Sequence, residues 1–504
     1  LRESNTDPEN PHNWSTLRKS TVTVLIWYFP TRKLAPRGPL LTKIPSMYTF
    51  TIYCGSSIYV PSVEQIIESF GVSETVASLG LALYVLGYGL GPLLFSPLSE
   101  VPYIGRNPIY ITTFLIFILL TVAAALCPDF AGFLVLRFLQ GFFGSPCLAT
   151  GAATLTDMFS VIYIPYSLTA WSAAMYCGPA LGPLFSGFTV TAKGWRWSMW
   201  ELLWISAFMF LPLFFFLPET STPTLLYHKA QRLRAERHLD GVAIDVDAST
   251  ERVMRTETVE LALVKPFEIT VKDPAIAFVN IYASIHATHT SYRIHELTKS
   301  GQTSFTYGVY YSFFEVFPLV YPKIYGMNLG ETSAVFVCVL VACVLGAAWY
   351  CSWYRFFAEQ RFQKLGTFDA QETFLRPGLA GVFGVTAGMF LFGWAARVSV
   401  HWVVPTIGII MYCGCGFVVG LGMFIYLPLS YPQYAASLFA ANDAFRSTFA
   451  AAAILFGRPL YLTLGVAKGC SLLGGLSVLG IAGFWYLFMY GERLRQRSNF
   501  TVQG

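Results

Sequence analysis

The chain has 504 residues, of which 55% are hydrophobic and only 12% are charged. Soluble proteins carry about 25% charged residues, so this composition excludes a disordered chain, a nucleic-acid-binding protein and an ordinary soluble enzyme of this size. The net charge of +5 says less than the positions of the charges. A bilayer crossing needs about 20 mostly apolar residues, and the sequence therefore predicts a polytopic integral membrane protein.

Apolar runs bounded by Gly, Pro and charged residues predict the spans. After a polar tail at 1–20, the first half has runs at 47–66, 76–98, 107–127, 131–152, 166–190 and 197–217. The second half has runs at 329–351, 377–396, 402–427, 436–460 and 467–490, followed by a tail at 492–504. Between the halves, residues 219–273 hold eight Lys/Arg and ten Asp/Glu, which predicts a soluble central loop.

The first span of each half is interrupted. An apolar run that begins at 21 stops at 29–46 and resumes at 47, and the short apolar stretches 274–285 and 307–322 are separated by a polar stretch at 286–306. We interpret 29–46 and 286–306 as aberrant insertions, such as retained introns, because removing each one joins its flanks into a span of ordinary length. The prediction is then an all-α protein of twelve transmembrane helices in two six-helix bundles, at 21–218 and 274–491.

Lys and Arg predict the orientation. With the N-terminus inside, 19 of these residues lie on the cytoplasmic side and 6 on the opposite side. The positive-inside rule therefore places both termini and the central loop in the cytoplasm.

Acidic and basic residues in the hairpin after the second span suggest a gate. Glu100 precedes Gly105 and Arg106, and Asp157 closes the fourth span, where it could meet the same hairpin. A carboxylate and a guanidinium can bridge helix ends in one conformational state and separate in another. The alternative is a solvated turn.

The fourth span carries Arg137 and, three residues later on the same helix face, Gln140. An arginine inside a span is costly and usually marks a transport pathway or a buried pair. The alternative is that Arg137 extends to the outer surface, since it lies only about two turns from the start of the span.

The fifth span contains two Gly-Pro pairs, Gly178-Pro179 and Gly182-Pro183. Small residues every four positions allow close helix packing, and proline loosens the helix backbone. Packing is the default interpretation, although two Gly-Pro pairs at this spacing are more specific than a strip of small residues.

Glu315 is the most informative single residue, because it lies in the apolar aromatic run YYSFFE. Burial penalises its charged form, which suits a carboxyl that loads and releases a proton or binds a cation. The alternative is a carboxylate at the outer membrane edge. Asp443 and Arg446, three residues apart, are predicted to form a structural ion pair rather than a substrate site. The candidate cavity residues are Tyr84, Tyr310, Tyr311, Phe314 and Asn442.

Other chemistries find no support in the sequence. His286, His289 and His295 have no Cys or acidic partner at ligand spacing, so no metal is expected. There is no phosphate-binding GKS/GKT loop and no HExxH or GxSxG motif, so neither an ATP-driven pump nor an enzyme is expected.

These motifs together resemble the major facilitator superfamily, and within it the fungal twelve-span drug:proton antiporters of the multidrug and polyamine type. The first-hairpin motif, the Arg137 motif and the Gly178–Pro183 antiporter motif are similar to the family's, as are LPET at 217–220 and LSYPQYAASLFAANDAFR in the second half. The first-hairpin motif departs from the superfamily form by extra residues between the acid and the glycine. The resemblance covers nearly the whole chain.

The resemblance implies a plasma-membrane antiporter that exports small amphipathic or cationic organic compounds by alternating access. It would use the proton gradient and no cofactor, and a monomer in the lipid bilayer is expected. Glu315 would be the proton or cation site, Arg137 and Gln140 would tune coupling, and Glu100, Gly105, Arg106 and Asp157 would form the cytoplasmic gate. The alternatives are uptake of a small nutrient, a sensor that transports nothing, and a non-functional mis-spliced product.

Overall fold

The computed structural model describes residues 43–239, 301–366, 368, 370–430 and 435–496, in which every regular element is a helix. In the first half they are α2 (Lys43–Ser57), η2 (Val60–Ser62), α3 (Val63–Phe70), α4 (Glu74–Glu100), α5 (Asn107–Leu126), α6 (Phe130–Gly144), α7 (Pro146–Met158), α8 (Ile164–Lys193), α9 (Arg196–Phe216) and α10 (Thr222–Leu239). In the second half they are α14 (Gly301–Tyr325), α15 (Leu329–Val335), α16 (Val337–Trp353), the π-helical η4 (Tyr354–Glu359), α17 (Gln360–Leu365), η5 (Gln371–Leu375), α18 (Arg376–Ala395), α19 (Val403–Ser430), α20 (Ala435–Leu464) and α21 (Val466–Gln496).

Local sequence signals set several helix starts. The Asp129 carboxylate caps α6 by accepting a hydrogen bond from the Gly132 backbone N–H at 2.8 Å. Asn328 and Glu331 form a reciprocal capping box at the start of α15. Proline stands in the first turn of α5, α7, α8 and α18, where its missing N–H leaves no donor unpaired.

Nine helical segments in the described ranges are long and apolar enough to cross a membrane. Three predicted spans are not among them. Helix α2 has only 15 residues, while α8 and α14 have 30 and 25 residues but are less apolar. The all-helical membrane architecture is confirmed, and the number twelve stays a prediction.

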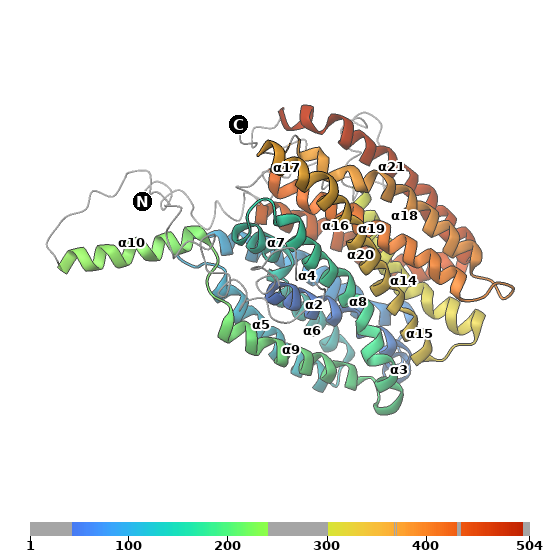
Figure 1. The fold of residues 1–504 in the computed structure, drawn as a ribbon. Coiled ribbons are helices and arrows are strands. Elements are labelled where there is room, and N and C mark those ends of the chain that lie inside the picture. Colours follow the sequence, from blue (N-terminus) through green and yellow to red (C-terminus); the bar gives the residue numbers. More distant parts are fainter. Residues whose placement is uncertain (1–42, 240–300, 367, 369, 431–434, 497–504) are drawn as a thin grey trace, which may run out of the picture.

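The two halves of the chain form two bundles that lie side by side, with α10 extending away from both (Figure 1). Two seams join the halves, α4 against α20 and α8 against α15 and α16. Glycine allows close approach at each seam, because a Cβ at Gly89 of α4 would collide with Ser447 of α20 and a Cβ at Gly187 of α8 would collide with Ser333 of α15.

The predicted insertions fall mostly outside the described residues. Helix α2 begins at Lys43 and α14 at Gly301, so residues 43–46 and 301–306, the last of each predicted insertion, are helical. The remainder of both stretches, the apolar segments 21–28 and 274–285, and the three histidines at 286, 289 and 295 lie outside the described residues.

Candidate functional site

Arg137 of α6 is completely buried, with 0% of its surface exposed, so it does not extend to the outer surface. Its guanidinium donates to the backbone carbonyls of Gly80 on α4 (3.1 Å) and of Gly55 (3.0 Å) and Ser56 (3.1 Å) on α2. The ring of Tyr84 lies 4.3 Å from Cζ, a cation–π distance. Arg137 therefore ties three helices of the first half together.

Gln140 completes this arrangement. Its carbonyl accepts from Arg137 Nη1 at 3.3 Å, and its amide donates to Thr121 Oγ1 of α5 at 3.1 Å. The Tyr84 hydroxyl donates to the Ile52 carbonyl of α2 at 2.9 Å. These polar groups satisfy one another inside the bundle, as buried polar groups must.

Glu315 of α14 is also buried, with 6% of its surface exposed. Its carboxyl is influenced by Ser78 of α4 and by two charged residues, Arg458 of α20 and Glu74 of α4. Those two form an ion pair across the seam, with Arg458 Nε 2.7 Å from Glu74 Oε2. Glu315 thus lies where both halves meet, beside the Glu74–Arg458 ion pair that joins them.

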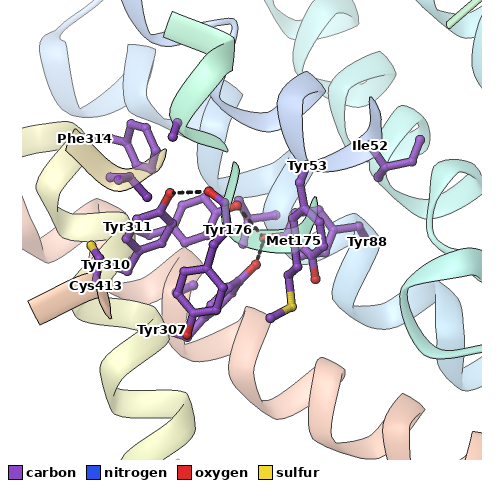
Figure 2. Packing of buried hydrophobic residues seen from close by; sticks show 14 of the residues in the cluster. Ile52, Tyr53, Tyr88, Met175, Tyr176, Tyr307, Tyr310, Tyr311, Phe314 and Cys413 are labelled. Atoms are coloured by element: carbon purple, nitrogen blue, oxygen red, sulfur yellow. Dashed lines mark hydrogen bonds between the residues drawn. The ribbon is translucent and has the colours of Figure 1, made fainter. Parts of the chain in front are cut away.

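Tyrosine hydroxyls connect the halves at the centre of the molecule (Figure 2). The Tyr88 hydroxyl of α4 bonds to Tyr307 (2.7 Å) and Tyr311 (3.0 Å) of α14, and Tyr311 also bonds to Ser56 Oγ of α2 (3.1 Å). One turn of α14 places these hydroxyls against the first half, which gives the two bundles a buried polar contact.

The remaining candidate cavity residues, Tyr310, Phe314 and Asn442, are all buried. Tyr310 donates to the Tyr176 carbonyl of α8 at 3.2 Å. Phe314 stacks on Phe336 with ring centroids 5.1 Å apart, and Asn442 of α20 is buried. Tyr310 therefore contacts the first half directly, whereas Phe314 packs within the second.

Asp443 and Arg446 of α20 form the expected ion pair, and its position was not foreseen. Arg446 also donates to the Tyr53 hydroxyl of α2 at 2.9 Å, and its Cζ lies 4.3 Å from the centroid of the Tyr307 ring. The pair is buried at the meeting point of α2, α14 and α20, so it takes part in the contact between halves as well as in the structure of its own helix.

Arg106 and Asp157 also form an ion pair, with Nη2 and Oδ2 2.6 Å apart. Burial disfavours the charged guanidinium, but Asp157, Tyr110 and Glu100 favour it more strongly, so the pKa of Arg106 is raised and the side chain stays charged. The pair joins the start of α5 to the end of α7, both in the first half. It therefore braces this end of the first bundle, called the hairpin end below, and its role as a gate stays a prediction.

Glu219, just after α9, caps the same hairpin. One carboxylate oxygen accepts from the backbone N–H groups of Arg106 (3.0 Å) and Asn107 (3.1 Å) at the start of α5, where a helix favours negative charge. Gly105 has φ +76°, and a Cβ there would collide with the Glu219 carboxylate. The Gly-Arg pair of the hairpin thus leaves room for a glutamate more than 100 residues away.

The Gly-Pro pairs of α8 face α2. A Cβ at Gly178 would come within 2.7 Å of Tyr53 Cβ, and a Cβ at Gly182 would meet the α2 backbone. Pro179 and Pro183 are buried in the same helix. The motif therefore places α8 close to the backbone of α2. The same helix carries Gly55 and Ser56, whose carbonyls accept hydrogen bonds from Arg137.

Residues 46–455 match the family described as Major Facilitator Superfamily. The chain belongs to the major facilitator superfamily.

Two relatives and one solved structure extend this finding. The MFS-type transporter pyvG of Aspergillus violaceofuscus is 39% identical over 99% of this chain and 84% of its own length. Fluconazole resistance protein 1 of Saccharomyces cerevisiae is 37% identical over 99% of this chain and 84% of its own length. The human organic anion transporter MFSD10 has the same fold, with a TM-score of 0.57 at 14% identity, over 91% of this chain and all of that chain.

Sequence reasoning missed several polar residues in this superfamily member. Tyr88 and Tyr307 each lie four residues from a predicted cavity tyrosine, Tyr84 and Tyr311, so the helical period alone could have found them. Glu219 belongs to the LPET motif at 217–220, which supported the family resemblance but gave this residue no role. No local sequence pattern shows that a loop residue caps a distant helix.

Proposed function

We propose that this chain is a plasma-membrane antiporter with twelve spans in two six-helix bundles, exporting small amphipathic or cationic organic compounds in exchange for protons. The hairpin end would face the cytoplasm, and both termini would lie on that side. No cofactor is needed, because the proton gradient supplies the energy, and the chain would work as a monomer.

The observation that carries this proposal is the similarity, along 99% of the chain, to a protein named for fluconazole resistance. A transporter confers resistance most simply by exporting the toxic compound. The Gly-Pro pairs packed on α2 and the charged residues buried inside the bundles support the same function, since ionisable groups in spans mark transport and proton pathways.

Alternating access is supported by the contacts between the halves. At the hairpin end, the Tyr166 hydroxyl of α8 donates to the Glu359 carboxylate of η4 at 2.6 Å. At the opposite end, Glu74 pairs with Arg458. Each contact joins one half to the other, so export would require the two to break in turn.

Glu315 is the proposed proton carrier, since it is the buried carboxyl beside the contact at the opposite end. Protons would enter from outside while the compound leaves. Raising the external pH lowers the inward driving force on protons, so export should fall. Glu315→Gln removes the titratable group, and export should then be slow at every external pH.

The test is fluconazole accumulation in a yeast strain that lacks its own drug exporters. We expect the tagged full-length chain to lower accumulation more in acidic than in neutral medium, and Glu315→Gln to remove that difference. Glu68→Gln, at an exposed position of α3, is the matched control and should behave as the unchanged chain does. A chain that reaches the plasma membrane and leaves accumulation of fluconazole and of other drugs unchanged would count against export. An unaltered pH response in Glu315→Gln would count against its role.

A further inference from the structure

A small cavity lies between the two halves at the centre of the molecule. Its walls come from Tyr176 of α8, Tyr307 of α14, Gly416, Gly420 and Phe424 of α19, and Arg446 of α20. It has room for about one water molecule. Because α8 belongs to the first half and the other three helices to the second, separation of the halves would widen this cavity.

Arg446 is the charged side chain in the lining, with only 3% of its surface exposed. Its guanidinium has five N–H donors. They serve the Asp443 carboxylate, the Tyr53 hydroxyl and the Met175 thioether sulfur at 3.2 Å. A thioether is a weak acceptor, and Arg446 Nε has no hydrogen-bond partner among the described residues. Since an unpaired buried donor is costly, the cavity favours a ligand that brings an acceptor.

The walls favour a flat ligand. The rings of Tyr307 and Phe424 lie 4.3 and 5.6 Å from Arg446 Cζ, and Tyr176 closes another side. Gly416 and Gly420 of α19 also line the cavity, and a Cβ at Gly420 would meet only the Tyr176 hydroxyl, at 3.5 Å. The three aromatic rings and the bare backbone at Gly420 leave a slot in which a planar ring can stack.

The charge balance selects among flat ligands. Asp443 already neutralises Arg446, so an anion would leave one uncompensated buried negative charge and a cation one uncompensated positive charge. A neutral acceptor costs neither. We propose that the slot formed by Tyr176, Tyr307, Phe424, Gly420 and Arg446 binds neutral planar aromatic or heteroaromatic compounds through an acceptor, a carbonyl oxygen or ring nitrogen, held by Arg446. This inference rests on the proposed function and replaces cations with neutral acceptors as its main substrates.

Three fluorescent tricyclic probes of similar shape test the proposal. Acridone is neutral with a carbonyl acceptor, 10-methylacridinium is a cation without an acceptor, and acridine-9-carboxylate is an anion. Binding is measured by fluorescence titration of the purified full-length chain in lipid nanodiscs. We expect acridone to bind most tightly. Tighter binding of either charged probe would overturn the assigned ligand class.

Two variants test the site itself. Arg446→Gln should weaken acridone binding by tenfold or more, as about 1.5–3 kcal/mol for a hydrogen bond to a charged group implies. Gly420→Leu should block the slot without changing any charge, which keeps the test valid if Arg446→Gln folds poorly. Arg397→Gln, outside the cavity at an exposed position, is the matched control and should bind normally.

Unchanged acridone affinity in folded Gly420→Leu, or in folded Arg446→Gln, would overturn the proposal. Binding to nanodiscs needs no transport, so the two hypotheses fail separately. A chain that binds acridone through Arg446 but exports nothing contradicts only the proposed function. A chain that exports fluconazole but does not bind acridone contradicts only the slot.

Discussion

The two buried arginines at the core differ in the chemistry of their partners. Arg137 donates mainly to backbone carbonyls, which cannot change rotamer, so it fixes the geometry of its bundle. Arg446 donates to side chains of both halves, which can move when the halves separate. Arg137 is therefore suited to a structural role beside the pathway, and Arg446 to a role that changes during transport.

We predict that Arg137→Lys lowers the stability of the first bundle. The lysine ammonium is a compact donor group that cannot reproduce the planar fork of arginine, so at least one of the carbonyls of Gly55, Ser56 and Gly80 would lose its partner. Each unsatisfied buried group costs about 1–3 kcal/mol. Thermal unfolding of the purified variant should occur at a lower temperature than that of the unchanged chain. Arg397→Lys, at an exposed position, is the control, and equal unfolding temperatures for the two variants would contradict the role.

At the level of helices, the seam between α4 and α20 depends on a glycine. We predict that Gly89→Val strongly reduces transport in a chain that still reaches the membrane, because the added side chain would collide with Ser447 and keep the halves from closing. Overpacking of this kind costs about 1–3 kcal/mol. Gly475→Val on α21 makes the same change in a helix where a Cβ would meet nothing within 4 Å, so fluconazole export by this variant should be normal. Normal export by both variants would contradict the prediction, because the seam would then accept the added side chain at Gly89.

Helix positions could be read from the sequence far better than helix facing. The apolar runs predicted α4, α5, α9, α18, α19 and α21 closely, since a span needs a certain length of apolar residues. The sequence also pointed to Arg106 and Asp157 as partners. It could not place Arg446, because an ion pair three residues apart on one helix has the same pattern on a lipid-facing surface, a packed seam or a cavity wall. Only the packing of α20 against α2 and α14 decides between these.

For the whole molecule, the charged contacts at the two ends are unequal. Glu74 is half exposed and Arg458 lies near the surface, and an exposed ion pair contributes only about 0–1 kcal/mol. Among the described residues, the hairpin end has hydrogen bonds between the halves from Tyr166 to Glu359 and from Tyr354 to the Ile162 carbonyl at 2.8 Å, and a weaker one from the Cys351 thiol to Thr169 at 3.9 Å. The contact at the opposite end is therefore the easier one to break, which suits release of a compound on that side.

The length of α2 bears on the predicted insertions. Its 15 residues would extend only about 22 Å at a rise of about 1.5 Å per residue, less than the hydrocarbon thickness of about 30 Å. Removing 29–46 would join the apolar residues 21–28 directly to those from 47 onward and supply the missing length. Removing 286–306 would likewise join 274–285 to the apolar part of α14. Helices α2 and α14 carry Ser56, Tyr307 and Tyr311, which take part in the contact between the halves, so we expect both spans to be complete.

We therefore predict that the dominant spliced transcript lacks the codons for 29–46 and 286–306. Sequencing full-length complementary DNA tests this directly, and mass spectrometry of the purified protein should find peptides that cross the two new junctions and none from inside the insertions. Reads that extend from the codons before residue 29 to those after residue 306 show that the whole region of the message was sequenced. A dominant message that carries both stretches, with peptides from them in the membrane fraction, would contradict the prediction. It would then require the short α2 to cross the bilayer with help from the helices packed around it.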